Sequence, residues 1–257
     1  MRDAGLQEAI RAVGSLTELA RRIGISQPSV SNWDRVPAER VVTVESVSGV
    51  ARTVLRPDLY ARGSSIGIDE TNIARAHEYF LLSRLLRCAP DAELLDRLAR
   101  LRGDASPLGR AHTSMADAAS RAKVENVERE YFNIFIGVAR GELLPYASYY
   151  RTGFLHDRPL ARLREDLARI GIERADGEVE PEDHAAVLCE IMAGLADRQL
   201  AAPAGADRQI FEEHLAPWIG RFFADLERTK AAGFYRHVGA LGRVFVDIEI
   251  EAFALPG

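Results

Sequence analysis

The 257-residue sequence lacks the features that mark secreted, membrane-spanning or disulfide-linked proteins. Its two cysteines, Cys88 and Cys189, are isolated, and without a Cys-x-x-Cys pair they give no metal or redox motif. A disulfide between them stays open, but a reduced compartment is the simpler expectation. The N-terminus has no apolar run of signal-peptide length, and no segment reaches about 18 uninterrupted apolar residues. We therefore expect a cytoplasmic protein without a membrane span.

Catalytic motifs are missing as well. There is no phosphate-binding glycine loop with its lysine, no His-Glu-x-x-His and no Gly-x-Ser-x-Gly. The six histidines are far apart in sequence and have no ligand spacing, so we predict neither a metal nor a cofactor. An enzymatic alternative rests only on Asp183 and His184 as an acid–base pair, with no nucleophile evident nearby. We expect a binding protein and not an enzyme.

The sequence also lacks a strong excess of either charge. Its net charge is −5 and its pI is near 5.8, which argues against a general coat for nucleic acids or membranes. Residues 1–63 hold nine Arg and seven Asp+Glu, about +2, which leaves 24 Lys+Arg and 31 Asp+Glu, about −7, for the remainder. A slightly basic head therefore precedes an acidic body, and the hydrophobic content of 47% allows a sizeable core.

Helical periodicity dominates the chain, and alternating strand patterns are absent. We predict an all-α protein with a small helix-turn-helix domain at 1–62, a short linker at Arg62–Gly67 and an all-helical bundle domain at 68–257 of roughly eight to ten helices. The expected body helices include Ala74–Arg87, Ala92–Leu101, Val124–Ala139, Pro159–Ile170, Glu182–Leu200, Phe211–Lys230 and Phe234–Phe253, punctuated by Pro/Gly clusters at Gly103–Gly109, Gly141–Pro145, Gly171–Gly177 and Ala201–Gly205.

The head contains two short helices joined by a turn. Leu16–Gly24 has one apolar face and ends at a glycine that permits the turn. Ser26 then suits the N-cap of a second helix, with Val30 and Trp33 inward at i, i+3 spacing. In a helix-turn-helix the second helix enters the major groove. Its outward polar residues can bond base edges and nearby arginines can hold phosphates; the candidates are Gln27, Ser29, Ser31 and Asn32 for bases, and Arg21, Arg22, Arg35 and Arg40 for phosphates.

Two further pieces of the head, Val36-Pro-Ala-Glu-Arg40 and Leu55-Arg-Pro-Asp-Leu-Tyr60, closely resemble the YdaS-like, Cro-related helix-turn-helix family. The resemblance covers about 60 residues and implies binding to duplex DNA, which we expect at an inverted repeat by a homodimer. The alternative is a degenerate module that serves as a docking surface, since the head is only mildly basic.

The segment Glu180-Pro-Glu-Asp-His184 stands out in the body. Pro181 suits the first turn of a helix, where its missing N–H costs nothing, and the acidic residues suit the positive end of the helix dipole. His184 would start the inward stripe of that helix, with Asp183 beside it. The plain alternative is a well-capped helix with one satisfied core histidine.

Aromatic residues lie in acidic surroundings upstream. Tyr131, Ile134 and Phe135 share one helical face, although core packing explains the last two at least as well. The loop Pro145-Tyr-Ala-Ser-Tyr-Tyr150 follows, and tyrosines offer a flat apolar face with a polar tip. Together these residues favour a groove for a peptide with apolar and basic residues.

The order of these motifs resembles the TorD/DmsD/NarJ family of redox-enzyme maturation chaperones over most of residues 70–255. The motifs are Glu130-Tyr-x-x-Ile-Phe-x-Gly137, Pro145-Tyr-x-Ser148, Glu180-Pro-x-Asp-His184, Glu190-Ile-Met192 and His214-Leu-x-x-Trp218. The resemblance implies an all-helical, TorD-like bundle and no catalysis. It assigns client binding to Tyr131, Ile134, Phe135, Pro145, Tyr146, Ser148, Glu180, Asp183 and His184.

The same resemblance implies the partner, a molybdoenzyme catalytic subunit or its twin-arginine signal peptide, held until the cofactor is inserted. Formate dehydrogenase or a relative is the client we would test first. The sequence departs from the family in two places: Ala147 replaces a commoner glutamate, and the head is not part of the usual pattern. The alternative function is a transcription regulator whose body senses client or peptide and whose head reads an operator.

Overall fold

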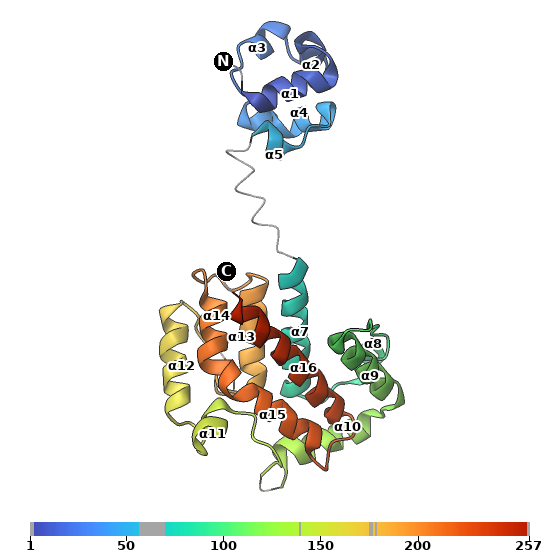
Figure 1. The fold of residues 1–257 in the computed structure, drawn as a ribbon, viewed down its shortest axis with the longest axis vertical. Helices are drawn as coiled ribbons and strands as arrows, with labels where there is room; N and C mark the ends of the chain where they lie inside the picture. Colours follow the sequence, from blue (N-terminus) through green and yellow to red (C-terminus); the bar gives the residue numbers. More distant parts are fainter. Residues whose placement is uncertain (1–2, 57–69, 139, 175–176, 178, 256–257) are drawn as a thin grey trace. The chain divides into compact units, whose positions relative to one another are not determined.

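The structure is a computed structural model that describes residues 3–56, 70–138, 140–174, 177 and 179–255. The described residues form helices, with one isolated β-bridge and no strand, so the prediction of an all-α protein is confirmed. The chain divides into two compact units, Met1–Glu70 and Thr71–Gly257, each with its own hydrophobic core (Figure 1). The predicted linker lies outside the described residues. No helix among those described is long and apolar enough to cross a membrane.

The first unit contains the predicted pair of short helices. Ser26 caps the second of them through its hydroxyl, which accepts the Ser29 N–H at 3.3 Å, and Gly24 ends the first in the left-handed region at φ 72°. Val30 is fully buried beneath the turn. The helices of this unit are α1 (Ala4–Val13), α2 (Leu16–Ile23), α3 (Gln27–Ser31), the 3-10 turn η1 (Ala38–Arg40), α4 (Val41–Ser48) and α5 (Arg52–Leu55).

Two sequence pieces that carried the resemblance of the head meet in space. The buried Arg56 guanidinium donates to the backbone carbonyl of Val36 at 2.7 Å, and the Val36 side chain is fully buried. A buried cation needs such a partner, since an unpaired one would cost several kcal/mol. Val36-Pro and Leu55-Arg therefore hold the end of the unit to its middle, while Pro57–Tyr60 lie outside the described residues.

The second unit packs its long helices around a shared core. Its largest fully buried side chains are Trp218, Tyr79, Tyr235, Phe211, Phe222 and Phe223. Figure 1 shows α16 lying across the bundle in front of α13. The helices are α7 (Glu70–Arg87), α8 (Ala92–Leu98), α9 (Pro107–Arg121), α10 (Val124–Tyr131), the π-helix η3 (Phe132–Ile136), α11 (Ala147–Thr152), α12 (Arg158–Arg169), α13 (Ala185–Ala196), α14 (Ala206–Ile210), the π-helix η4 (Phe211–Leu215), α15 (Ala216–Arg228) and α16 (Tyr235–Ala254).

Helices α15 and α16 approach so closely that a glycine is required between them. A Cβ added at Gly239 would lie 2.6 Å from the backbone nitrogen of Glu227 and 2.8 Å from the carbonyl oxygen of Phe223. Real Cβ atoms do not come this close to backbone atoms, so any side chain here would push the helices apart. Gly239 thus fixes the packing of the two longest C-terminal helices.

The π-helix η4 has a local cause in the sequence. Pro217 has no N–H to donate to the carbonyl of Glu213, and its ring would collide with that carbonyl in a regular helix. The chain widens to a π turn just before the proline, and the freed Glu213 carbonyl accepts from the Arg151 side chain at 3.0 Å. One helical run from Ala206 to Arg228 is therefore continuous but carries a bulge beside His214.

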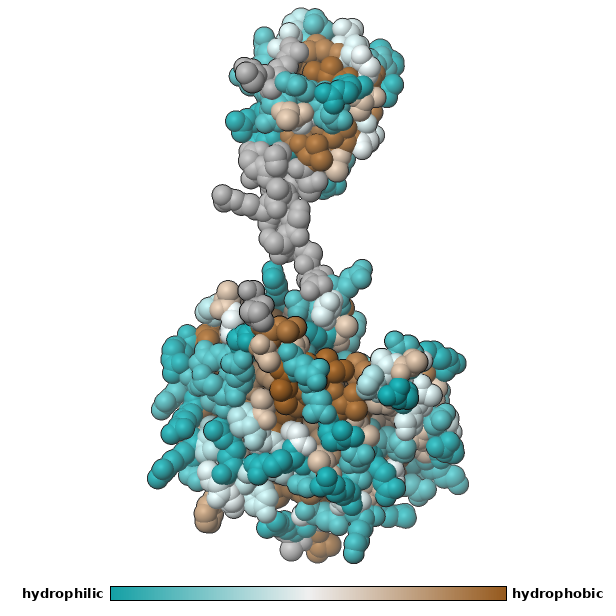
Figure 2. Space-filling model, viewed as in Figure 1, coloured by the Kyte–Doolittle hydropathy of each residue, from teal (hydrophilic) through white to brown (hydrophobic). Residues whose placement is uncertain are grey.

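The surface of the second unit is not uniformly polar. Figure 2 shows apolar residues gathered over α16, whose exposed apolar members include Ile248 and Ile250 at 40% and 44%. Between them Glu249 is buried, where its carboxylate pairs with Arg75 at 2.8 Å and accepts from the Tyr79 hydroxyl at 2.9 Å. A buried carboxylate with two such partners is compensated, so this cluster joins α7 to α16.

Three predicted helix limits are wrong for physical reasons. The helix expected from Glu182, with Pro181 at its start, begins at Ala185, and His184 is its N-cap. The Pro/Gly cluster at Gly103–Gly109 contains a helix start, since Ser106 caps α9 by accepting from Gly109 N–H at 3.0 Å. The helix expected over Val124–Ala139 turns into the π-helix η3 after Tyr131 and ends before Gly137.

Candidate functional site

Two segments that are far apart in sequence pair at the candidate site. Tyr146 and His184 form an isolated antiparallel bridge. The Ala147 N–H donates to the Asp183 carbonyl at 2.9 Å, and the Ala185 N–H donates to the Pro145 carbonyl at 2.8 Å. The tyrosine loop and the Glu180–His184 segment are therefore joined through their backbones, which sets the positions from which their side chains project.

Asp183 supplies the cap that α11 lacks in its own sequence. Tyr146, at the N-cap of α11, makes no side-chain capping bond, but the Asp183 Oδ2 atom accepts the Ser148 N–H at 2.8 Å. Negative charge at this end of a helix is favoured by the free N–H groups and the helix dipole. Asp183 is fully buried and Ser148 has no exposed surface either. The aspartate therefore holds α11 in place and is not available to a partner at the surface.

His184 has a comparable structural role. Its Nδ1 atom accepts the Ala186 N–H at 3.1 Å, so the imidazole caps α13. Its ring lies edge-on to the Tyr146 ring, with 5.0 Å between centroids. Both residues are positioned by the same bridge, and only 6% of His184 is exposed. The histidine supports Tyr146 from beneath.

Tyr146 presents the accessible polar group of this site. Its hydroxyl donates to the Glu180 Oε2 atom at 2.8 Å, and both residues are partly exposed. Burial, followed by the hydrogen bond to Glu180, raises the pKa of Tyr146 well above its usual range, so the phenol stays protonated and keeps donating. The arrangement orients a carboxylate towards solvent beside a flat aromatic face.

A cluster of aromatic rings forms the other side of the site. Tyr131 lies 5.0 Å from Phe135 and 5.8 Å from Tyr235, measured between ring centroids. The Tyr131 hydroxyl donates to the Arg87 carbonyl at 2.7 Å. Burial, with smaller effects from Cys88 and Glu180, raises the pKa of Tyr131 to about 12. Tyr131 and Phe135 are both partly exposed, so their rings offer apolar surface to a partner.

Gly137 and Glu130, the two ends of the motif Glu130–Gly137, have structural roles in the backbone conformation and in helix capping. Gly137 ends η3 at φ 62°, and a Cβ there would lie 2.2 Å from the Arg140 carbonyl oxygen, so only glycine fits. Glu130 accepts N–H groups at the start of α16, from Gly233 at 2.7 Å, Phe234 at 3.0 Å and Tyr235 at 2.6 Å. Glu130 is thus a cap for a distant helix.

The structure separates the sequence-predicted client residues into two groups by exposure. The partly exposed members are Tyr131, Phe135, Tyr146 and Glu180, and the buried members are Ile134, Pro145, Ser148, Asp183 and His184. Asp183, predicted to contact the client, caps α11 from a fully buried position. Ala147 is also buried, at 3%, so a glutamate there would need different surroundings.

Tyr150 does not belong to the site, although it lies in the same sequence loop. Its ring packs 5.5 Å from Trp218, and its hydroxyl donates to Asp225 at 3.1 Å, so it anchors α11 to α15.

Sequence reasoning missed Arg87. Its carbonyl accepts a hydrogen bond from the Tyr131 hydroxyl, and its side chain forms an ion pair with Glu190. Arg87 belongs to no motif, and no sequence signal identifies it.

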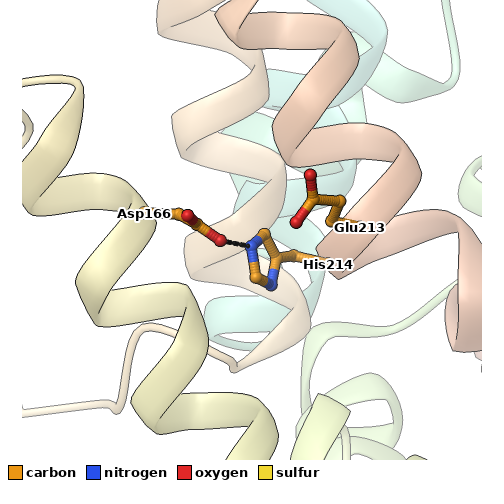
Figure 3. Close-up of side chains that lie close together, drawn as sticks. All are labelled: Asp166, Glu213 and His214. Carbon is orange, nitrogen blue, oxygen red and sulfur yellow. Dashed lines mark hydrogen bonds and ion pairs between the residues drawn. The ribbon is translucent and has the colours of Figure 1, made fainter.

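One further cluster of charged side chains has ligand-like geometry. Asp166, Glu213 and His214 each offer an atom within 4.8 Å of the others (Figure 3). The His214 Nε2 atom is hydrogen-bonded to Asp166 at 2.7 Å, and the same aspartate pairs with Arg169 and accepts from Gln209. Because the buried carboxylate is already compensated within the protein, we assign the pair to holding α12 against η4.

In the first unit, the candidate base-contacting residues are exposed on and just after α3; they are Gln27, Ser29, Ser31 and Asn32. Two of the candidate phosphate contacts are engaged elsewhere. Arg21 and Arg22 both donate to Glu18, at 2.7 and 2.8 Å. These hydrogen bonds lower the pKa of Glu18 to about 2, so the carboxylate is charged and offsets part of the positive charge next to α3.

Comparisons with known proteins support both parts of the resemblance seen in the motifs. Residues 101–224 match the family described as nitrate reductase delta subunit, and residues 6–63 match the family described as bacterial toxin YdaS. The chaperone protein TorD of Vibrio atlanticus is 25% identical over 206 residues, which cover 71% of this chain and 96% of that protein. The chaperone protein TorD of Vibrio cholerae serotype O1 is 29% identical over 126 residues, or 46% of this chain and 57% of that protein.

Among solved structures, a candidate redox enzyme maturation protein from Archaeoglobus fulgidus aligns with a TM-score of 0.46 and 21% identity, over 67% of this chain and 93% of that one. The resemblance of the body to the TorD/DmsD/NarJ family, and of the head to YdaS, is confirmed by the family and sequence matches. The named relatives are chaperones and not catalytic enzymes, which goes against the enzymatic alternative.

Proposed function

We propose that this chain, whose body resembles TorD chaperones, is a maturation chaperone that binds a molybdoenzyme catalytic subunit or its twin-arginine signal peptide during cofactor insertion. The observation that carries the proposal is the convergence of the Tyr146 loop and the Glu180–His184 segment, which sets a carboxylate and an aromatic face at one accessible place. Formate dehydrogenase or a relative is the client class that we would test first.

The proposed mechanism is binding without turnover. Glu180 would receive an arginine of the client, because an oriented carboxylate in a partly dry site forms a stronger bond than an exposed ion pair. Tyr131, Phe135 and Tyr146 would cover apolar side chains on either side, since tyrosine faces are effective contacts at interfaces. Asp183 and His184 would act as positioning residues that fix α11 and the Tyr146 ring. Release would follow when the loaded client folds its segment away.

The test starts by identifying the client. The full chain is purified with its partners, and mass spectrometry is expected to recover a molybdoenzyme catalytic subunit. Calorimetric titration with the N-terminal peptide of that subunit then measures the affinity. We expect Glu180→Gln to weaken binding by about 1–2 kcal/mol, between five- and thirtyfold. Asp96→Asn, an exposed carboxylate on α8, is the matched control and should leave the affinity unchanged.

Two results would contradict the proposal. If Glu180→Gln binds the peptide as tightly as the wild type, the site does not hold a client arginine. If no molybdoenzyme subunit is recovered from cells that produce one, the chaperone assignment itself fails. Thermal melts of each variant separate lost binding from lost folding, and Glu180 is partly exposed, so its replacement should leave the melting temperature nearly unchanged.

A second function, transcription regulation, is favoured by one observation on the head. The exposed polar residues that follow Ser26 could bond bases, and Gln27 and Asn32 suit adenine. Selection from a random duplex library should then enrich an inverted repeat bound by a homodimer. Gln27→Ala or Asn32→Ala should cost about 1–3 kcal/mol at one base position. A selection that enriches no motif would contradict DNA reading by this head.

A further inference from the structure

A groove of about 600 Å³ lies on the second unit, along α13 between α7 and the end of α12. Its floor is apolar: Val187 and Ile191 of α13 are each 8% exposed, and Leu167 of α12 is 4% exposed. Ile172 and Leu200 close its sides. Figure 1 shows α13 running between α12 and α7, as these lining residues require. A depression of this size with an apolar floor is of the kind that binds ligands.

Phe80 forms the edge of this α7–α13 groove and is 55% exposed. Because Phe80 adjoins the apolar floor, it enlarges a contiguous apolar patch, and such patches mark interaction sites. His77, three residues earlier, is also exposed and lies on the same helical face. The outer face of α7 therefore extends the apolar floor towards solvent.

The rim of the groove is acidic. The carboxylate residues that line it are Glu173, Glu182, Glu190 and Asp197, against one arginine, Arg174, and His77. Glu182 is paired with Arg164 at 2.8 Å, and Glu190 is paired with Arg87. Among the described residues, neither Glu173 nor Asp197 forms an ion pair. The Asp197 Oδ1 atom accepts the Gln199 N–H at 3.0 Å, but no described cation pairs with either carboxylate, so a cation at the rim would be attracted to them.

Contacts made by Arg87 connect this groove to the candidate client site. The Tyr131 hydroxyl donates to the Arg87 carbonyl, and the Arg87 side chain pairs with Glu190 at the rim. On the other side, Glu180 of the client site is two residues from Glu182, which lines the groove. One extended ligand could therefore occupy both places, with its path running past the start of α13.

We propose that the α7–α13 groove binds a basic amphipathic helix of the client, with its apolar face on Phe80, Val187 and Ile191 and its arginines or lysines at Glu173 and Asp197. The proposal rests on the proposed chaperone function and adds a second contact region to it. A helix suits the site because a groove between two helices accepts side chains repeated at i, i+3, i+4 and i+7. The acidic rim selects basic over acidic helices through charge complementarity.

The test uses a defined probe and the full chain. The probe is a fluorescent synthetic peptide of about 18 residues with leucines at helical spacing and arginines on its other face. A matched peptide carries glutamates in place of the arginines. By anisotropy, the arginine peptide should bind at least about tenfold more tightly than the glutamate peptide, and its affinity should fall with rising salt.

Groove variants then locate the binding. Phe80→Ser should weaken the arginine peptide about tenfold, as should Glu173→Gln combined with Asp197→Asn. The matched controls are Phe154→Ser, an aromatic that is 72% exposed elsewhere, and the α8 pair Glu93→Gln with Asp96→Asn. These controls should change the affinity less than about twofold.

Several results would overturn the proposal. Equal affinity for the two peptides would contradict the role of the acidic rim. A Phe80→Ser protein that binds the arginine peptide as tightly as the wild type would contradict binding in the groove. If Glu180→Gln weakens the client peptide while the groove variants do not, the chaperone function stands and only the groove assignment fails. If sedimentation shows self-association that Phe80→Ser abolishes, the groove binds a second copy of the chain instead. Failure to recover any molybdoenzyme subunit would contradict the chaperone function, irrespective of peptide binding in the groove.

Discussion

Replacing Asp183 tests whether this residue acts through the fold. Asp183→Ala removes the acceptor of the Ser148 N–H, in a place with no access to solvent. A buried donor left without a partner costs about 1–3 kcal/mol, and loss of the negative charge at the α11 N-terminus adds about 0.3–1 kcal/mol. We therefore expect a loss of about 2–3 kcal/mol. In a unit of this size that lowers the melting temperature by about 4–12 °C.

The control for this experiment is Ser148→Ala. The Ser148 hydroxyl is buried and has no hydrogen-bond partner among the described residues, so its removal should be neutral or slightly stabilising. Melts and urea titrations of both variants, together with client-peptide affinity, complete the comparison. An Asp183→Ala protein that melts as the wild type does, but no longer binds the peptide, would refute a positioning role and require direct contact between Asp183 and the client.

Four further predictions concern other parts of the chain. The hydrogen bond from His112 to Glu78 raises the pKa of His112. The free energy of unfolding, compared with that of His112→Gln, should therefore be greatest below a pH of about 6.5 and should decline as the pH rises through the raised pKa. Urea titrations at a series of pH values measure this difference. Gly239→Ala should lower stability by about 1–3 kcal/mol in urea titrations, because its Cβ collides with backbone of α15. Glu18→Gln frees two arginines and should strengthen duplex DNA binding at all sequences, with a steeper salt dependence; unchanged affinity would contradict the phosphate role. Removal of residues 1–62 should leave a folded body by circular dichroism, since each unit has its own core; an unfolded product would contradict two separable domains.

The long periodic segments were readable from the sequence, because a continuous apolar stripe leaves few alternatives to a helix. Helix α16 ends within one residue of the prediction at each end, and α7 ends where predicted. The π-helix η4 was not predicted, although Pro217 is its cause, since proline rules out the regular hydrogen bond without specifying what replaces it. The start of α13 was misplaced because Pro181 suits the first turn of a helix, which favoured a start near Glu182. In the structure the helix starts after His184, whose side chain caps it.

The candidate site shows a sharper limit of sequence reasoning. The sequence placed Asp183 and Tyr146 in one group, and the structure does bring their segments together. The sequence could not show that Asp183 is buried while Tyr146 is partly exposed at the surface, because burial depends on residues from several helices. The groove at Phe80 escaped notice for a related reason. It is formed by α7, α12 and α13 together, and its apolar residues look like ordinary core positions in each helix alone.

The capping of α16 by Glu130 has a consequence for the order in which the protein is made. Tyr131 and Phe135 rest on Tyr235, and Glu130 holds the start of α16, where Gly233 is translated 103 residues after Glu130. At ordinary synthesis rates of roughly 5–20 residues per second, those residues take several seconds to follow. During that interval the aromatic side of the site has no support. The growing chain on the ribosome therefore lacks a finished aromatic cluster until α16 has been synthesised.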